Sequence, residues 1–184
     1  MNKLVKYRFF DNKNGKSSGV YSSLNCGLKS KDKLINIKKN IEIAKNKISK
    51  KKKFLIIPNQ SHSSKCLIAR KNKYEYNCDG IVTCENNFIL GITSADCLPI
   101  IFIDYQNETI GVCHAGWKGL KKGIIENTIN KMLQIGSIKS NISAFIGPCI
   151  RKSSYEVSRE FINDMKFKDK GLWTKKDDKY YFDL

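Results

Sequence analysis

Residues 91–123 read GITSADCLPIIFIDYQNETIGVCHAGWKGLKKG, and this stretch predicts how the rest of the chain folds. Leu98–Ile103 is a continuous apolar run with the length of a buried strand. A second strand, Thr109–Cys113, ends on His114, and a glycine-containing turn then leads into a helix. An earlier apolar strand, Phe88–Ile92, runs into the loop that ends on Cys97. Loops that follow rigid strands often carry functional groups, so this thiol and imidazole indicate a functional site.

Strands and helices alternate along the whole chain. We expect strands at residues 4–10, 54–57, 65–69, 79–83, 88–92, 98–103, 109–113 and 142–146, and helices at 34–47, 120–135 and 154–165. Residues 171–184 show no strong period. This order favours an α/β or α+β layered fold, and we expect one domain over residues 1–184. Because no G-x-G-x-x-G follows a strand and no P-loop is present, the pattern excludes these two nucleotide-binding classes.

The composition indicates a soluble, cytoplasmic protein. No apolar run in the 184 residues approaches a membrane span, and the N-terminus lacks the apolar core and cleavage site of a signal peptide. The seven cysteines are an odd number without the spacing of a disulfide scaffold. We therefore expect free thiols, of which one could be functional.

The net charge of +17 raises the question of nucleic-acid binding. Residues 29–53 contain eleven lysines against two acidic residues. Only four of the 34 basic residues are arginine, however, and asparagine, isoleucine and lysine are frequent throughout, as A/T-rich codons would produce. No recognition helix, zinc finger or RNA-binding aromatic motif accompanies the lysines, so we do not expect a nucleic-acid partner.

His62 is the third polar residue that follows an apolar strand, and the chain contains only two histidines. Together, His62, Cys97 and His114 provide two nitrogens and one sulfur, which suits zinc with one open coordination position. A second hypothesis is a Cys97 nucleophile with a histidine base, oriented by Asp96 or Asp104. A third is that both histidines and the thiol have purely structural roles, and the spacing leaves all three open.

The turn at Gly116–Gly119 predicts an anion site. Free N–H groups at a helix start attract anions, glycine lets the backbone approach the ligand, and Lys118 adds positive charge with its neighbours Lys121 and Lys122. A phosphate beside a zinc or thiolate centre would indicate phosphate chemistry. The alternative is an ordinary helix cap with surface lysines.

Five segments together resemble a known family. They are SSGVYSSLNCG (17–27), QSH (60–62), TSADCLP (93–99), HAGWKG (114–119), and IGPCI (146–150) followed by YEV (155–157). The chain resembles the YfiH/DUF152 family, also called the laccase-domain or multicopper polyphenol oxidase family and known as peptidoglycan editing factor (PgeF).

The resemblance implies an α/β layered fold with a mixed central sheet flanked by helices, and a zinc site made by His62, Cys97 and His114. It also implies purine nucleoside phosphorylase activity on adenosine, inosine, guanosine and methylthioadenosine, with adenosine deaminase as a further activity. Phosphate is then expected near Gly116 and Lys118. Asn25 and Asp96 are expected to line the nucleoside pocket.

Three other functions remain as alternatives. One is a Cys-His hydrolase that edits peptidoglycan precursors, as the family's other name suggests, and another is an inactive or partner-binding remnant. The third, a copper polyphenol oxidase, is disfavoured because a blue-copper site would use both histidines and leave none for a trinuclear cluster. Adventitious copper at the same three residues is compatible with the sequence.

The chain departs from the family pattern in three ways. Asn12 stands where the family usually has arginine. Lys118 also replaces an arginine, which keeps the charge but loses the bidentate fork. Family members usually continue beyond the point that corresponds to Leu184. We expect a sheet edge left exposed there to favour a homodimer.

Overall fold

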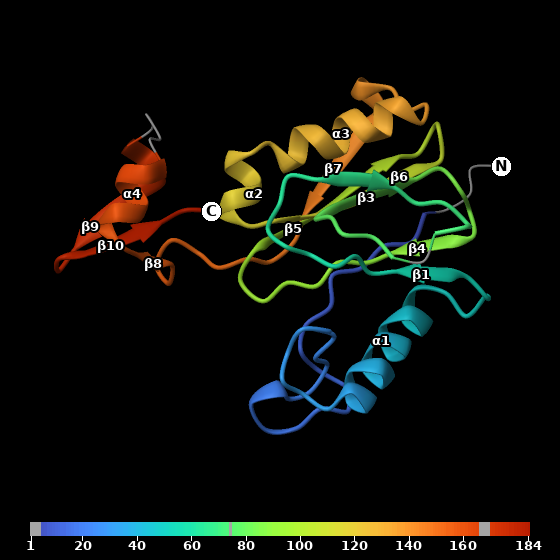
Figure 1. Cartoon of the computed structure of the whole chain (residues 1–184), viewed down its shortest axis with the longest axis horizontal. Coiled ribbons are helices and arrows are strands. Elements are labelled where there is room, and N and C mark those ends of the chain that lie inside the picture. The colour runs from blue at the N-terminus through green and yellow to red at the C-terminus, as the bar shows by residue number, and fades with distance from the viewer. Residues whose placement is uncertain (1–4, 74, 166–169) are drawn as a thin grey trace.

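The structure is a computed structural model that describes residues 5–73, 75–165 and 170–184. Its centre is a five-stranded sheet in the order β2-β3-β6-β5-β7 (Figure 1). These strands are β2 (Cys66–Ile68), β3 (Gly80–Thr83), β6 (Thr109–Ala115), β5 (Leu98–Asp104) and β7 (Ile142–Ile146). The β2–β3 pair is parallel and the other pairs are antiparallel, so the sheet is mixed, which confirms the expected α/β layered class.

Both faces of this sheet are covered. Helices α2 (Trp117–Lys121) and α3 (Ile124–Gln134) lie over one face, and the parallel pair β1 (Phe54–Ile56) and β4 (Phe88–Leu90) lies on the other (Figure 1). Helix α1 (Leu34–Ile48) lies beyond β1 and β4. Coverage on both sides explains why the central strands read as continuous apolar runs.

Strands β5 and β6 form the central hairpin, and each is seven residues long. Ile100 and Phe102 of β5 pack in the core beneath α3, whereas Ile101 packs against the core on the β1–β4 side. The register runs from Asp104 opposite Thr109 to Leu98 opposite Ala115. The start of β5 therefore lies directly beside the end of β6, and the candidate site forms at this edge.

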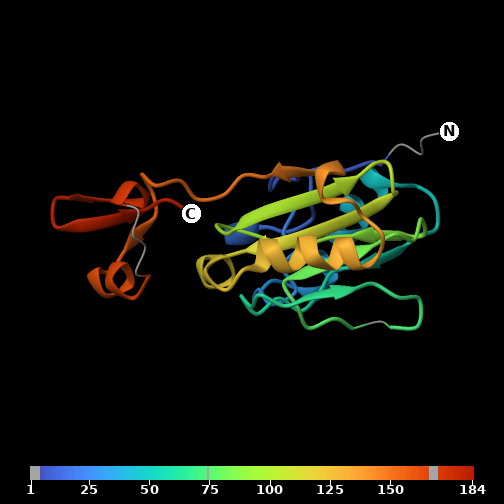
Figure 2. The ribbon, with the colours of Figure 1, turned by 90° about the horizontal axis from the view of Figure 1, so that it is seen from above.

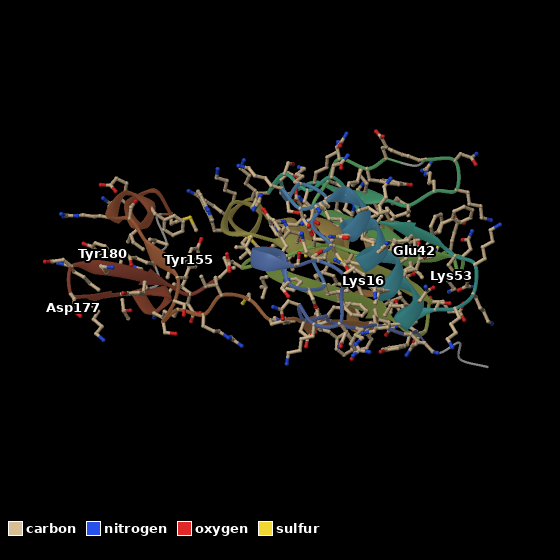
Figure 3. All side chains as sticks on the ribbon, turned by 90° about the horizontal axis from the view of Figure 1, so that it is seen from below. Lys16, Glu42, Lys53, Tyr155, Asp177 and Tyr180 are labelled. Carbon is tan, nitrogen blue, oxygen red and sulfur yellow. The ribbon has the colours of Figure 1, made fainter. Side chains whose placement is uncertain are left out.

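The C-terminal residues form a small unit at one end of the main body, beyond α2 (Figure 2). It contains β8 (Glu156–Val157), α4 (Arg159–Met165), β9 (Trp173–Lys176) and β10 (Lys179–Phe182), with strand order β8-β10-β9. Tyr155 lies at the junction with the main body (Figure 3). A ring contact of 4.9 Å between the centroids of Trp117 and Phe161 joins this unit to α2.

Short 3-10 helices connect several elements: η1 (Gly19–Tyr21), η2 (Lys139–Asn141) and η3 (Lys170–Leu172). None of the helices within the described ranges combines the length and apolarity that crossing a membrane requires. All seven cysteines are free.

The expected strand at 4–10 is wrong for residues 5–10, which form no strand, and residue 4 lies outside the described residues. These residues are instead held by aromatic packing. The Tyr7 and Phe145 rings lie 4.5 Å apart, and a Cβ added to Gly147 would come within 2.4 Å of the Phe9 ring. Aromatic residues that pack on a sheet can therefore resemble a strand in the sequence.

Two expected helices differ in extent. The helix expected at 120–135 is divided, because Gly123 has a φ of +80°, a left-handed conformation that does not continue a right-handed helix. The helix expected at 154–165 begins only at Arg159, since residues 156–157 pair with β10. The C-terminal tail, which showed no strong period, forms the β9–β10 hairpin.

Asp104 fixes the turn of the central hairpin. Its side chain is fully buried and accepts hydrogen bonds from the backbone N–H groups of Gln106 (3.0 Å), Asn107 (3.0 Å) and Ile138 (3.1 Å). Burial alone would raise the pKa of Asp104, but the hydrogen bonds from Asn107, Ile138 and Gln106 outweigh it and lower the pKa. The folded state therefore favours the ionised carboxylate.

We predict that Asp104→Asn lowers the free energy of unfolding by about 1–3 kcal/mol, because an amide accepts these N–H bonds less well and brings its own donors. Since the folded pKa is depressed, the carboxylate stabilises the fold above its unfolded pKa of about 4, and this contribution is lost as pH falls through the folded pKa. Urea titrations at pH 7 and pH 3 measure both effects. Equal stability of variant and wild type at pH 7 would contradict the prediction.

Candidate metal centre

Cys97 and His114 meet because of the β5–β6 register. Cys97 directly precedes β5, and His114 is the penultimate residue of β6, opposite Pro99. Cys97 is half-buried and His114 is buried. The sheet thus presents a thiol and an imidazole at the same edge, as the strand ends predicted.

His62 reaches this edge from the loop between β1 and β2. Its φ of +59° is in the left-handed region, which non-glycine residues rarely occupy. The backbone N–H of His62 donates to Asp79 Oδ1 (3.0 Å), and the flanking N–H groups of Ser61 (3.1 Å) and Ser63 (2.7 Å) donate to Asp79 Oδ2. Such strain persists where the surroundings hold the backbone in place, and here one carboxylate does so.

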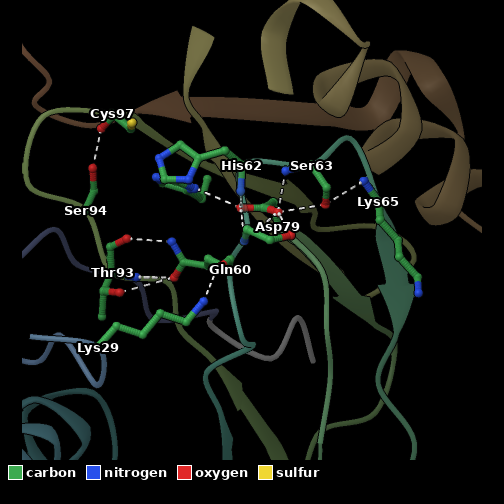
Figure 4. Close-up of polar contacts among 11 residues, drawn as sticks. Lys29, Gln60, His62, Ser63, Lys65, Asp79, Thr93, Ser94 and Cys97 are labelled. Carbon is green, nitrogen blue, oxygen red and sulfur yellow. Dashed lines mark hydrogen bonds and ion pairs between the residues drawn. The ribbon is translucent and has the colours of Figure 1, made fainter. Parts of the chain in front are cut away.

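Asp79 also orients the second histidine. It directly precedes β3, is fully buried, and accepts a hydrogen bond from His114 Nδ1 at 3.0 Å (Figure 4). Burial alone would raise the pKa of Asp79, but hydrogen bonds from His114, Ser63 and Ser61 outweigh it and lower the pKa. One ionised carboxylate therefore positions both histidines.

This contact selects the form of His114 that binds metals. An ionised carboxylate only accepts, so Nδ1 carries the proton and Nε2 keeps its lone pair. Burial lowers the pKa of His114, partly offset by Asp79, and His62 lowers it further. The neutral imidazole is thus favoured, as metal ligation requires.

The three side chains form one cluster. Ligand atoms of His62, Cys97 and His114 all lie within 4.8 Å of one another, and the two imidazole rings are edge-to-face with centroids 4.8 Å apart. Ligands held at about 2.0–2.3 Å from a tetrahedral zinc lie roughly 3.3–3.8 Å apart. A small inward shift of the exposed His62 side chain would close the difference, so the donor set and its spacing fit zinc.

The surroundings of Cys97 disfavour its thiolate. Burial raises the pKa of Cys97, and the negative charges of Asp96 and Asp79 raise it further. A cysteine nucleophile usually has a lowered pKa, whereas a metal ion ionises a coordinating thiol outright. The arrangement therefore favours a metal ligand over a Cys-His dyad, and a dyad would also leave one of the two histidines without a role.

Gly116 gives the cluster its space. A Cβ at this position would lie 2.8 Å from His62 Cδ2 and 2.9 Å from Cys97 Sγ. Its φ of −77° and ψ of 164° are open to any residue, so the requirement for glycine is steric. The backbone at the start of α2 thus lies directly against two of the three candidate ligands.

The side chains of Gln60, Lys29 and Ser94 make hydrogen bonds within and between the loops around the cluster. Gln60 accepts from the N–H of Thr93 (2.9 Å) and donates to the Thr93 carbonyl (2.7 Å) (Figure 4). Lys29 Nζ donates to the Gln60 carbonyl at 2.5 Å, and Ser94 Oγ donates to the Cys97 carbonyl. These bonds tie the His62 loop to the Cys97 loop and to the loop that contains residue 29.

Three other predicted site residues, Asn25, Asp96 and Lys118, are not part of the metal-ligand cluster. Asn25 is half-buried and engaged within its own loop, donating to Ser30 Oγ (2.9 Å) and Asp32 Oδ2 (3.1 Å). Asp96 is exposed beside Cys97. Lys118 is exposed, with its Nζ 5.3 Å from the ring centroid of its neighbour Trp117.

Sequence reasoning missed Asp79, which positions both histidines. In the sequence it stands before Gly80, and an Asp-Gly pair reads as a turn at the start of a strand. A second sign was available: a carboxylate commonly supports a metal-binding histidine, so an acidic residue at a neighbouring strand end was a candidate.

We predict that Asp79→Asn weakens zinc binding by about 10–100-fold, because the amide cannot hold both histidines as the carboxylate does. Competition with a chromophoric chelator measures the affinity. Asp104→Asn is the matched control, since it also changes a buried, hydrogen-bonded aspartate but lies at the other end of β5. Equal zinc affinity in the two folded variants would contradict the role assigned to Asp79.

Similar proteins are known in sequence and in structure. The chain is 33% identical over 193 residues to the purine nucleoside phosphorylase RP494 of Rickettsia prowazekii (strain Madrid E), covering all of this chain and 76% of that protein. It is 29% identical over 122 residues to the adenosine deaminase RL5 of an unknown prokaryotic organism, covering 61% of this chain and 47% of that protein. The crystal structure of the Bacillus licheniformis protein YfiH has a similar fold, with a TM-score of 0.82 and 24% identity over 94% of this chain and 70% of that one.

The comparison with protein families covers almost the whole sequence. The family described as multi-copper polyphenol oxidoreductase laccase matches residues 6–184. This range contains the His62, Cys97 and His114 cluster and the central sheet that positions it. The chain therefore belongs to the multi-copper polyphenol oxidoreductase laccase family.

Proposed function

We propose that this protein is a zinc-dependent purine nucleoside phosphorylase that also deaminates adenosine. The observation that carries the proposal is the cluster of His62, Cys97 and His114, with Asp79 behind both histidines. Relatives named purine nucleoside phosphorylase and adenosine deaminase support the substrate class. The substrates would be inorganic phosphate and purine nucleosides such as adenosine, inosine, guanosine and methylthioadenosine, in the cytoplasm.

Zinc accounts for the donor set better than a multicopper centre does. Three protein ligands and one open position are the usual arrangement of catalytic zinc. Two histidines and one cysteine also suit a single copper ion, but the chain contains no further histidine for a trinuclear copper cluster. Oxidation of polyphenols by a multicopper mechanism is therefore not supported, despite the family's description.

The reactions would use the edge of the sheet where β6 meets α2. In phosphorolysis, a phosphate oxygen attacks C1′ of the ribose, the bond to the purine nitrogen breaks, and the base takes up a proton as it leaves. We place the phosphate near Gly116, whose bare backbone faces the cluster, and near the cationic Lys118. Helix α2 has only five residues, so Lys118 would contribute more to binding than the helix dipole.

The same cluster would serve deamination. When bound, zinc acts as a Lewis acid that activates water for hydrolysis at the purine ring. Asp96 is exposed beside Cys97, within the loop that would face a nucleoside. Asn25 accepts a hydrogen bond from Gly27 N–H, in the same segment as Lys29, whose Nζ donates to the Gln60 carbonyl of the His62 loop. We assign Asp96 and Asn25 to the surroundings of the proposed nucleoside site.

The test is a phosphate-dependent assay on zinc-loaded protein. We predict that hypoxanthine is released from inosine only when phosphate is present. Cys97→Ala should lower kcat/KM by at least about 100-fold, because losing a ligand should cost no less than losing a supporting residue. Cys84→Ala is the matched control, since Cys84 is exposed and follows the far end of β3.

Chromatography of the products and elemental analysis of the same samples separate the outcomes. About one zinc per wild-type chain and none in Cys97→Ala would accompany the loss of activity. Full activity in Cys97→Ala, or nucleoside cleavage independent of phosphate, would contradict the proposed function.

A further inference from the structure

A second cysteine lies next to the candidate metal ligand. Strands β5 and β7 pair antiparallel from Asp104 opposite Ile142 to Ile100 opposite Ile146. Two hydrogen bonds extend this register beyond the strands: Gly147 N–H to the Pro99 carbonyl, and Ile150 N–H to the Asp96 carbonyl, both 2.9 Å. Cys97 directly follows Asp96 and Cys149 directly precedes Ile150, so the two cysteines lie on the same side of the second bond.

The two hydrogen bonds hold the segments that carry Cys97 and Cys149 side by side. A disulfide joins Cα atoms about 4.4–6.8 Å apart, so it forms only between residues of such neighbouring segments.

Both thiols also lie on the side of the sheet that α2 and α3 cover. Cys97 Sγ would be 2.9 Å from a Cβ on Gly116, the residue before α2. Cys149 packs against the core that includes Leu98 of β5 and Ile124 of α3. Both thiols therefore lie on the side of the helices.

A second pair of cysteines on the sheet is less suited to this reaction. Cys66 and Cys113 are buried, and they lie on strands that pair with opposite sides of β3, both beside Gly80, so a strand separates them. Cys97 and Cys149, by contrast, are both half-buried and within reach of a small oxidant.

We propose that Cys97 and Cys149 form a reversible disulfide that switches the metal centre off. With hydrogen peroxide as the oxidant, two S–H bonds and one O–O bond break, the S–S bond forms, and the two electrons and two protons reduce the peroxide to two water molecules. A disulfide sulfur is no longer a thiolate ligand, so metal binding and the disulfide exclude one another. A dithiol reductant reverses the reaction by thiol–disulfide exchange.

The experiment uses the full chain, reduced and metal-free, treated with hydrogen peroxide and then digested without reduction. We expect mass spectrometry to find a peptide pair joined through Cys97 and Cys149, and dithiothreitol to separate it. Oxidised wild type should lose at least about nine-tenths of its zinc binding, and reduction should restore it. Because the disulfide is mapped directly, this result is independent of the proposed enzymatic activity.

Cys149→Ser and Cys149→Ala should bind zinc as wild type does, and after a mild peroxide treatment they should keep that binding. Cys84→Ser is the matched control and should remain as sensitive as wild type, because Cys84 is exposed and outside the pair. A disulfide that joins Cys97 to another cysteine would overturn the proposal. So would equal loss of zinc binding in the Cys149 variants and wild type.

Discussion

The buried carboxylate of Asp79 is the interaction on which the candidate centre depends. It accepts backbone hydrogen bonds from the loop that contains His62 and a ring hydrogen bond from His114, so it holds together segments that are far apart in the sequence. Burial of a carboxylate is costly unless its charge is satisfied, and these donors satisfy it. The same bonds keep His62 in a left-handed backbone conformation that an exposed loop would not maintain alone.

The central sheet places Cys97 and His114 beside the residues that Asp79 holds. Antiparallel pairing of β5 with β6 places Cys97 beside the end of β6, and Asp79 comes from the adjoining start of β3. Gly116 then leaves room where α2 begins. The strands thus set the positions of Cys97, His114 and Asp79, while the exposed side chain of His62, on a backbone that Asp79 holds, can move to close around an ion. Two fixed ligands and one adjustable ligand suit a catalytic metal, which needs a defined geometry and one accessible side.

Much of the fold could be predicted because apolar runs such as residues 98–103 leave few alternatives to a buried strand. The grouping of His62, Cys97 and His114 was one of three hypotheses that their positions at strand ends left open, and the family resemblance favoured it. Asp79 was missed, because its donors lie 16–35 residues away in the sequence, and only the general association of carboxylates with metal-binding histidines pointed to it. Gly123 divides a helix through a backbone angle that the apolar period does not reveal, and the C-terminal hairpin is held by aromatic contacts such as that between Trp173 and Tyr180.

Zinc K-edge X-ray absorption of the zinc-loaded protein tests the central claim most directly, because it reports the ligand atoms themselves. The account predicts one sulfur at about 2.3 Å and two imidazole nitrogens at about 2.0–2.1 Å, with one further light atom completing four-coordination. A shell without sulfur, or one with two or more sulfurs, would contradict the assignment of His62, Cys97 and His114 as the ligands.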